Sequence, residues 1–216
     1  MEKRISYNVQ MTGAINYAMQ QNYIPVVRSI ILSNNTEEPI RDITVKISSE
    51  PTFIKPFQTD ISQINPGEPV EISPVKLVLS SEFLFSLTER LNGSIHIEIT
   101  SGGETLNEGD SDIALLPFDY WQGHYILPEL TAAFVTPNHP RIDDITAKAG
   151  AYLKKWTGDP SFTGYQSRNP NVVKKQIAAI YAALQAENIA YRNPPASFEQ
   201  LGQRVRMPYA VLEQKG

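Results

Sequence analysis

The sequence predicts an α+β fold, in which an antiparallel β-sandwich over residues 1–120 is followed by an α-helical region over residues 121–216. Apolar residues alternate with a period of two in the first part and recur at helical spacing in the second. The charge differs as well. Residues up to Phe118 carry 8 Lys and Arg against 15 Asp and Glu, whereas the residues after it carry 11 against 8. Two differently built parts are therefore expected.

Period-two alternation predicts the strands of the sandwich. It recurs in four segments: Ile5/Tyr7/Val9, Ile43/Val45/Ile47, Val75/Leu77/Leu79 and Ile95/Ile97/Ile99. A more continuous apolar run over 25–33 predicts a strand inside a sheet, and 113–116 predicts a closing strand. Turn-forming residues bound these segments at 33–35, 65–69, 92–93 and 101–103. About seven or eight strands at this spacing indicate a sandwich of the immunoglobulin type.

One interruption of the strand pattern predicts a short helix between Ser80 and Leu91. Ser80 can cap it, and the apolar residues that follow lie at helical spacing. His96 lies between two inward-facing isoleucines and is expected to face solvent, because successive strand residues point to opposite faces.

Aromatic residues gather where the strand pattern ends and helical spacing begins. Four of them are candidates for a seam between the two parts: Phe118, Tyr120, Trp121 and Tyr125. Large aromatic surface is readily buried where elements meet. A base-stacking platform is the alternative, but no basic groove residues accompany the rings.

The second part predicts two helices. In the first, an apolar face starts at Ile142 and reaches Trp156, Pro140 suits the first turn, and Gly158 ends the helix. His139 is expected at its cap. After a loop over 158–170, a second helix is predicted from Asn171 to Ala190. Its expected inner stripe is Val173, Ile177, Ile180, Tyr181 and Leu184, and its alanines permit close packing.

The last ten residues predict a short capped helix that leads into a tight turn. Pro208 suits its first position, Val211 and Leu212 are apolar, and Lys215 and Gly216 suit its end. Two lysine pairs, Lys154–Lys155 and Lys174–Lys175, are expected on solvated helix faces. The small positive surplus of this part is below what a nucleic-acid-binding face normally shows.

No complete active site is visible in the sequence. Cysteine is absent, there is no Gly-x-Ser-x-Gly elbow or phosphate-binding glycine loop, and three scattered histidines give no metal spacing. Asp143 and Asp144 are adjacent and point about 100° apart on a helix, which is poor geometry for paired carboxylates. We therefore expect no catalytic, cofactor-binding or metal-binding residue in this chain.

Composition also bears on location. No segment approaches the roughly 20 consecutive apolar residues of a membrane span, and the N-terminus lacks the apolar stretch of a secretory signal. The absence of cysteine fits a reducing compartment. We expect a cytoplasmic protein without membrane contact.

Several motifs together resemble the N-terminal region of large bacterial proteins related to superfamily I DNA helicases. The similar segments are Gln176–Leu184, Ile189–Phe198 and Gly202–Pro208, together with Leu115-Leu116 followed by Trp121-Gln-Gly123. In that family the segment matching Pro208–Gly216 is followed by a Gly-Thr-Cys-Leu-Asp motif. That motif resembles the nucleophile helix of transglutaminase-like and papain-like cysteine enzymes.

The resemblance implies that residues 121–216 are the front part of a truncated transglutaminase-like domain, whose cysteine would lie beyond Gly216. None of the family's catalytic residues maps onto a position of this chain. The expected function is then that of a non-catalytic N-terminal module for interaction, regulation or positioning of an ATP-dependent motor. ATP and Mg are expected only in the missing motor domains of the parent hydrolase.

Two other functions stay open. In one, the helical part completes a cysteine enzyme that needs Cys, His and Asp downstream. In the other, the 216 residues are a complete small adaptor. The expected partners are the remainder of the chain's own polypeptide, other proteins, and a second copy through the truncated face. Nucleic acid is expected only for the full-length protein.

Overall fold

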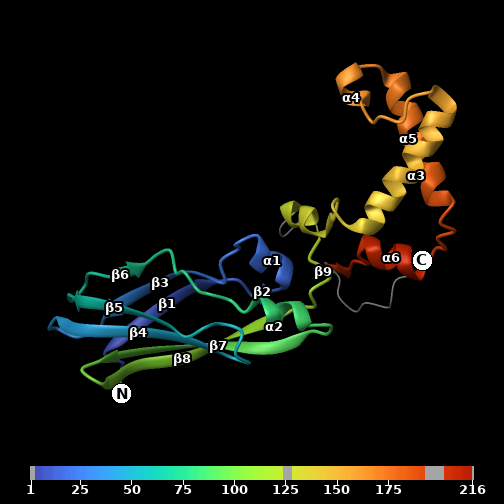
Figure 1. Ribbon diagram of the computed structural model, residues 1–216. Helices are drawn as coiled ribbons and strands as arrows, with labels where there is room; N and C mark the ends of the chain where they lie inside the picture. Colours follow the sequence, from blue (N-terminus) through green and yellow to red (C-terminus); the bar gives the residue numbers. More distant parts are fainter. Residues whose placement is uncertain (1–2, 124–127, 193–201, 216) are drawn as a thin grey trace. The chain divides into compact units, whose positions relative to one another are not determined.

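The computed structural model describes residues 3–123, 128–192 and 202–215. The fold mixes α and β structure. The chain forms two compact units, Met1–Tyr120 and Trp121–Gly216, which are called unit 1 and unit 2 below. Unit 1 contains the strands of two sheets, and unit 2 is mainly helical (Figure 1).

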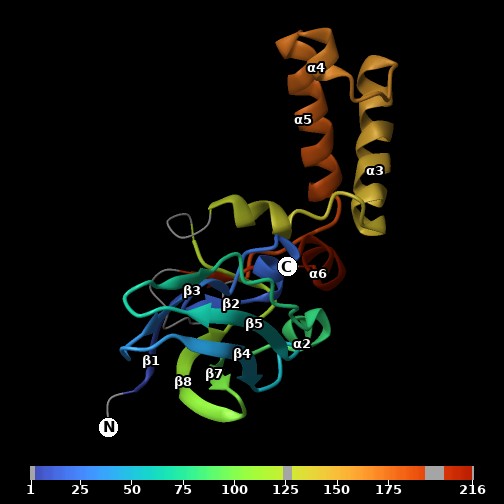
Figure 2. The same cartoon turned by 90° about the vertical axis from the view of Figure 1, so that its left-hand side faces the viewer.

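Unit 1 consists of two sheets that form two layers (Figures 1 and 2). The first sheet has the order β1–β3–β6, with bounds Ile5–Met11, Val27–Asn34 and Val70–Ile72. The second has the order β2–β8–β7–β4–β5, with bounds Ala14–Ile15, Glu104–Leu115, Leu91–Ser101, Ile40–Glu50 and Phe57–Ile64. Neighbouring strands are antiparallel, apart from β2 with β8. Two short helices complete the unit, α1 (Tyr17–Gln21) and α2 (Ser81–Ser86).

The predicted alternation produces the core of unit 1. In β4 and β7, Val45 lies opposite Ile99 and Ile47 opposite Ile97, and all four side chains are buried. Such apolar cross-strand pairs stabilise a sheet. His96 lies on the other face and contacts Asp110 at 3.0 Å, so the predicted solvent-facing position is confirmed.

Two buried asparagines join the two sheets. Asn107 of β8 donates through Nδ2 to the carbonyl of Ile5 in β1, at 2.8 Å. Asn34 at the end of β3 donates through Nδ2 to the carbonyl of Ile64 in β5, at 3.0 Å. A buried amide is stabilising only where it is hydrogen-bonded, so these bonds hold the layers in register.

Two predictions for unit 1 were wrong in detail. Residues 75–79 form no regular strand: Leu79 makes one isolated bridge to Ile54, and the carbonyl of Val75 accepts from the amide of Leu77, which interrupts a ladder. Residues 92–93 are not a turn but lie within β7. A Cβ on Gly93 would lie 3.1 Å from the carbonyl oxygen of Glu50, so this glycine permits close approach within the sheet.

The predicted helix at Ser80 exists, with the Ser80 side chain accepting from the amide of Phe83, but it is short. It ends at Ser86, and Leu91 already belongs to β7. The closing strand predicted at 113–116 is the end of the 12-residue strand β8. The first residues of β8 and most residues of β5 are polar, so the apolar pattern of the sequence does not predict these parts as strands.

Unit 2 is built around the helices α3 (Pro140–Thr157) and α5 (Pro170–Gln185), which lie side by side (Figures 1 and 2). The remaining described elements of unit 2 are η1 (Pro128–Phe134), α4 (Gly164–Ser167), α6 (Pro208–Gln214) and β10 (Gln203–Arg204). The strand β10 pairs with β9 (Tyr120–Trp121), in which unit 1 ends and unit 2 begins. The core of the unit is a small cluster: Ile145, Ala149, Leu153, Ala179, Ala183 and Leu212.

The ends of α3 follow the sequence prediction. His139 caps the start through Nδ1, which accepts from the amide of Arg141 at 3.2 Å, and Pro140 occupies the first turn. Gly158 ends the helix with φ +85°, a backbone conformation that favours glycine. In α6, Pro208 is again in the first turn, and Lys215 rather than glycine is the left-handed cap.

The predicted inner stripe of α5 was wrong for four of its five residues, whereas the fifth, Val173, is partly buried. Within unit 2, Ile177, Ile180, Tyr181 and Leu184 are 61%, 40%, 67% and 38% exposed. The helix instead buries the face that carries Gln176 and two alanines, Ala179 and Ala183. Alanines let α5 approach α3 closely, and the large apolar residues then lie outside the contact. Among the described residues, no helix combines the length and apolar character that crossing a membrane requires.

Candidate functional site

The aromatic residues predicted as a seam are placed by different contacts. The Phe118 ring lies 5.2 Å from Phe85 of α2, which lies 5.0 Å from Tyr17 of α1. Tyr120 is 7% exposed, and its carbonyl accepts from Nδ2 of Asn16, the residue that caps α1. Phe118 and Tyr120 therefore close one end of the core of unit 1.

The other two seam residues carry less information. Trp121 begins unit 2 and is partly buried. Tyr125 lies outside the described residues. A role of the four aromatic residues between the units stays a prediction.

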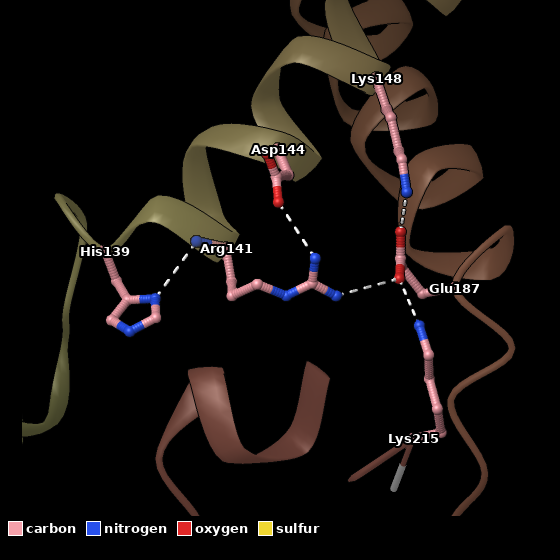
Figure 3. Close-up of polar contacts among 6 residues, drawn as sticks. All are labelled: His139, Arg141, Asp144, Lys148, Glu187 and Lys215. Carbon is pink, nitrogen blue, oxygen red and sulfur yellow. Dashed lines mark hydrogen bonds and ion pairs between the residues drawn. The ribbon is translucent and has the colours of Figure 1, made fainter. Parts of the chain in front are cut away.

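A buried carboxylate with three cations is the principal polar cluster of unit 2 (Figure 3). The side chain of Glu187, just after α5, is 4% exposed. It accepts hydrogen bonds from Lys148 of α3 and from Nζ of Lys215 at the end of α6, the second at 2.5 Å. Nη2 of Arg141 lies 3.7 Å from Oε2 of Glu187, and Nη1 of Arg141 pairs with Asp144 at 3.0 Å. We call these five residues the Glu187 cluster.

The cluster holds the last helix against the other two. Hydrogen bonds from Lys148 first, and from Lys215 second, lower the pKa of the Glu187 carboxyl from 4.5 to about 2. The carboxylate therefore stays ionised near neutral pH and has no proton to donate there. Beside it the carbonyl of Lys215 accepts from the amide of Ala190, at 2.9 Å. This arrangement is suited to fastening α6 rather than to acid–base chemistry.

An aromatic stack lies at the start of α6. The ring of His139 stacks on Tyr209 with a centroid distance of 4.9 Å and an interplanar angle of 19°. Because Nδ1 of His139 accepts from the amide of Arg141, the capping bond orients the ring. His139, which in sequence is only a candidate cap, thus also helps to position α6.

Among the residues that the structure describes, the acidic and histidine side chains do not gather into a site. Within the described residues, no set of three or more His, Asp and Glu side chains could hold a metal ion. Asp144 is paired with Arg141, whereas Asp143 lies on another side of α3. This agrees with the divergent geometry expected for adjacent helical residues.

The exposed face of α5 is the feature of unit 2 best suited to interaction. Ile177, Ile180, Tyr181 and Leu184 have the spacing i, i+3, i+4, i+7, so they form one continuous stripe along the helix. We call these four residues the α5 stripe. An apolar stripe of this kind commonly docks a partner.

The sequence pattern predicts the α5 stripe but places it in the core. The pattern shows that these residues share one face of the helix, but it does not show which face of α5 contacts α3. It missed the Glu187 cluster altogether. Lys148 and Lys215 lie 39 and 28 positions from Glu187, so no local pattern signals their meeting.

Comparison with known proteins does not assign the chain to a family. No protein-family model matches the chain, and no curated protein matches it.

Proposed function

We propose that this chain is a non-catalytic interaction module, the N-terminal region of a protein related to superfamily I DNA helicases. In this proposal unit 1 is an immunoglobulin-like β-sandwich, and unit 2 is the front part of a transglutaminase-like domain. The α5 stripe is the observation that carries the proposal, because it is a built apolar face that its own unit leaves uncovered.

The remainder of the same polypeptide is the proposed occupant of the α5 stripe. The resemblance supplies a continuation after Gly216, and the Glu187 cluster fastens α6, which leads into that continuation, to α3 and the end of α5. Completing the burial of four large apolar side chains that are 38–67% exposed contributes roughly 3–6 kcal/mol. That is enough to favour an intramolecular docked state.

The coding sequence beyond Gly216 tests the proposal most directly. The expected result is an open reading frame that continues, whereas an in-frame stop codon would overturn the proposal and leave a complete adaptor. A cysteine followed downstream by histidine and aspartate would instead favour the cysteine-enzyme alternative.

A physical test uses the 216-residue chain itself. We expect it to bind a hydrophobic dye such as 1-anilinonaphthalene-8-sulfonate, and to self-associate at high concentration, because the stripe is uncovered. The double variant Ile177→Ser and Tyr181→Ser should lose most of both signals with unchanged far-UV circular dichroism. Gln185→Ser, an exposed change on the same helix, is the matched control. Negligible dye binding by a strictly monomeric wild-type chain would contradict the uncovered stripe.

A further inference from the structure

Unit 2 brings unpaired positive charge together at one end of its helix pair. The last turn of α3, the short helix α4 and the first turns of α5 lie together there (Figures 1 and 2). We call residues 154–175 the hairpin tip. Its five cations are Lys154, Lys155, Arg168, Lys174 and Lys175, and its one acid is Asp159. The tip is therefore net +4 in a chain whose total charge is −4.

These cations are free to meet a ligand. All five residues are exposed, and in the part of the chain that the structure describes their side chains make no ion pair or hydrogen bond. Asp159 forms no ion pair with them among the described residues, since its carboxylate accepts from the amide and the hydroxyl of Ser161, at 2.9 and 2.7 Å. The cations of the Glu187 cluster, by contrast, are already engaged.

Exposed rings lie among the unpaired cations. Tyr165 is 90% exposed, Trp156 46% and Phe162 37%. An open hollow of about 540 Å³ lies beside α3. Phe162 and Pro160 line it together with residues of α3 that include Lys154 and the acid Asp143. One ring and one lysine of the hairpin tip thus border the same hollow.

We infer that the hairpin tip binds single-stranded nucleic acid. Cations that follow a phosphate backbone, combined with rings on which bases stack, are the two elements of such sites. A duplex would not use the rings, because its bases are already stacked. An acidic peptide would engage the cations but gives the exposed rings no flat partner. The inference is independent of the proposed function, since it does not use the α5 stripe.

Fluorescence anisotropy with a fluorescein-labelled oligothymidylate of about 20 nucleotides tests the inference. We expect saturable binding by the 216-residue chain, weakening as salt rises from about 50 to about 200 mM. The double variant Lys154→Ala and Lys174→Ala should bind about tenfold more weakly. The slope of the logarithm of its binding constant against the logarithm of the salt concentration should be smaller in magnitude by about 1.4, because two phosphate contacts are lost. Tyr165→Ala should weaken binding about tenfold with the salt slope unchanged.

The matched control removes the same charge from unit 1. Lys55 and Lys76 are exposed there, and the double variant Lys55→Ala and Lys76→Ala should bind like the wild type. Equal weakening by both double variants would overturn the inference, since net charge alone would then explain binding. It would also be overturned by no binding at about 100 µM protein in low salt. Equally effective displacement by polyglutamate, or binding only to phosphatidylserine vesicles, would assign the tip to a different partner.

Discussion

Replacing Gln176 with Leu should loosen the loop between α3 and α5, because this buried amide holds the loop at two points. Oε1 of Gln176 accepts from the amide of Gly164 at 3.1 Å, and Nε2 donates to the carbonyl of Ser161 at 3.0 Å. A Cβ at position 164 would run into the Gln176 amide, so the glycine and the glutamine fit each other. Leu fills a similar volume but can make neither bond.

The loss of stability in Gln176→Leu depends on how deeply the amide of Gly164 and the carbonyl of Ser161 are buried, because these two groups lose their partner. Gly164 is buried, so its unpaired amide costs about 1–3 kcal/mol. Ser161 is half-buried, and water can satisfy its carbonyl, so that loss is about 1 kcal/mol. We therefore expect Gln176→Leu to lower the free energy of unfolding of unit 2 by about 2–4 kcal/mol.

Urea denaturation followed by tryptophan fluorescence measures this loss. Both tryptophans of the chain, Trp121 and Trp156, belong to unit 2, so the signal reports on that unit. Gln185→Leu changes an exposed glutamine on the same helix and should shift the free energy by no more than about 0.5 kcal/mol. The reasoning is refuted if Gln176→Leu is as stable as the wild type, or if Gln185→Leu is destabilised as much.

Two further predictions concern buried polar groups. The folded state lowers the pKa of Glu187 to about 2, so the contribution of this carboxylate to stability is present above about pH 4.5 and is lost as the pH falls toward 2. The urea midpoint of unit 2 should therefore decline between pH 4.5 and pH 2, and Glu187→Gln should lower the midpoint at neutral pH and flatten this decline. An unchanged pH profile in the variant would contradict the role of the cluster. In unit 1, Asn34 is 6% exposed; its Nδ2 donates to the carbonyls of Ile64 and Glu38, and its Oδ1 accepts from the amide and the hydroxyl of Thr36. Asn34→Ala should therefore lower the free energy of unfolding of unit 1 by about 2–4 kcal/mol, measured by urea denaturation followed by circular dichroism. Asn8→Ala, at an exposed position, is the control and should change this free energy little.

Most secondary structure of the chain could be predicted, because it depends on local pattern. The alternation of Ile95, Ile97 and Ile99 fixes which face of a strand is apolar, and Pro140 and Gly158 mark the ends of a helix by their own backbone preferences. The prediction failed where a neighbour decides: Gly93 suits a turn in isolation but lies inside β7, close to the carbonyl of Glu50.

The candidate sites were less predictable than the elements. The apolar residues of α5 were evident as a stripe, but whether the stripe or the alanines face α3 depends on how closely the helices approach. Glu187 gave no signal, since its partners come from distant parts of the chain. The lysine pairs of α3 and α5 were correctly expected on the surface, but their common location was not.

The sequence by itself determined the local features: a strand-rich first part, helices bounded by Pro and Gly, the charge difference, and the absence of cysteine. The tertiary structure decided the features that carry the proposals, namely the uncovered α5 stripe, the buried Glu187 cluster and the unpaired charge of the hairpin tip. The physical reason is that periodicity and capping act within a few residues, whereas burial and ion pairing depend on which distant segments meet.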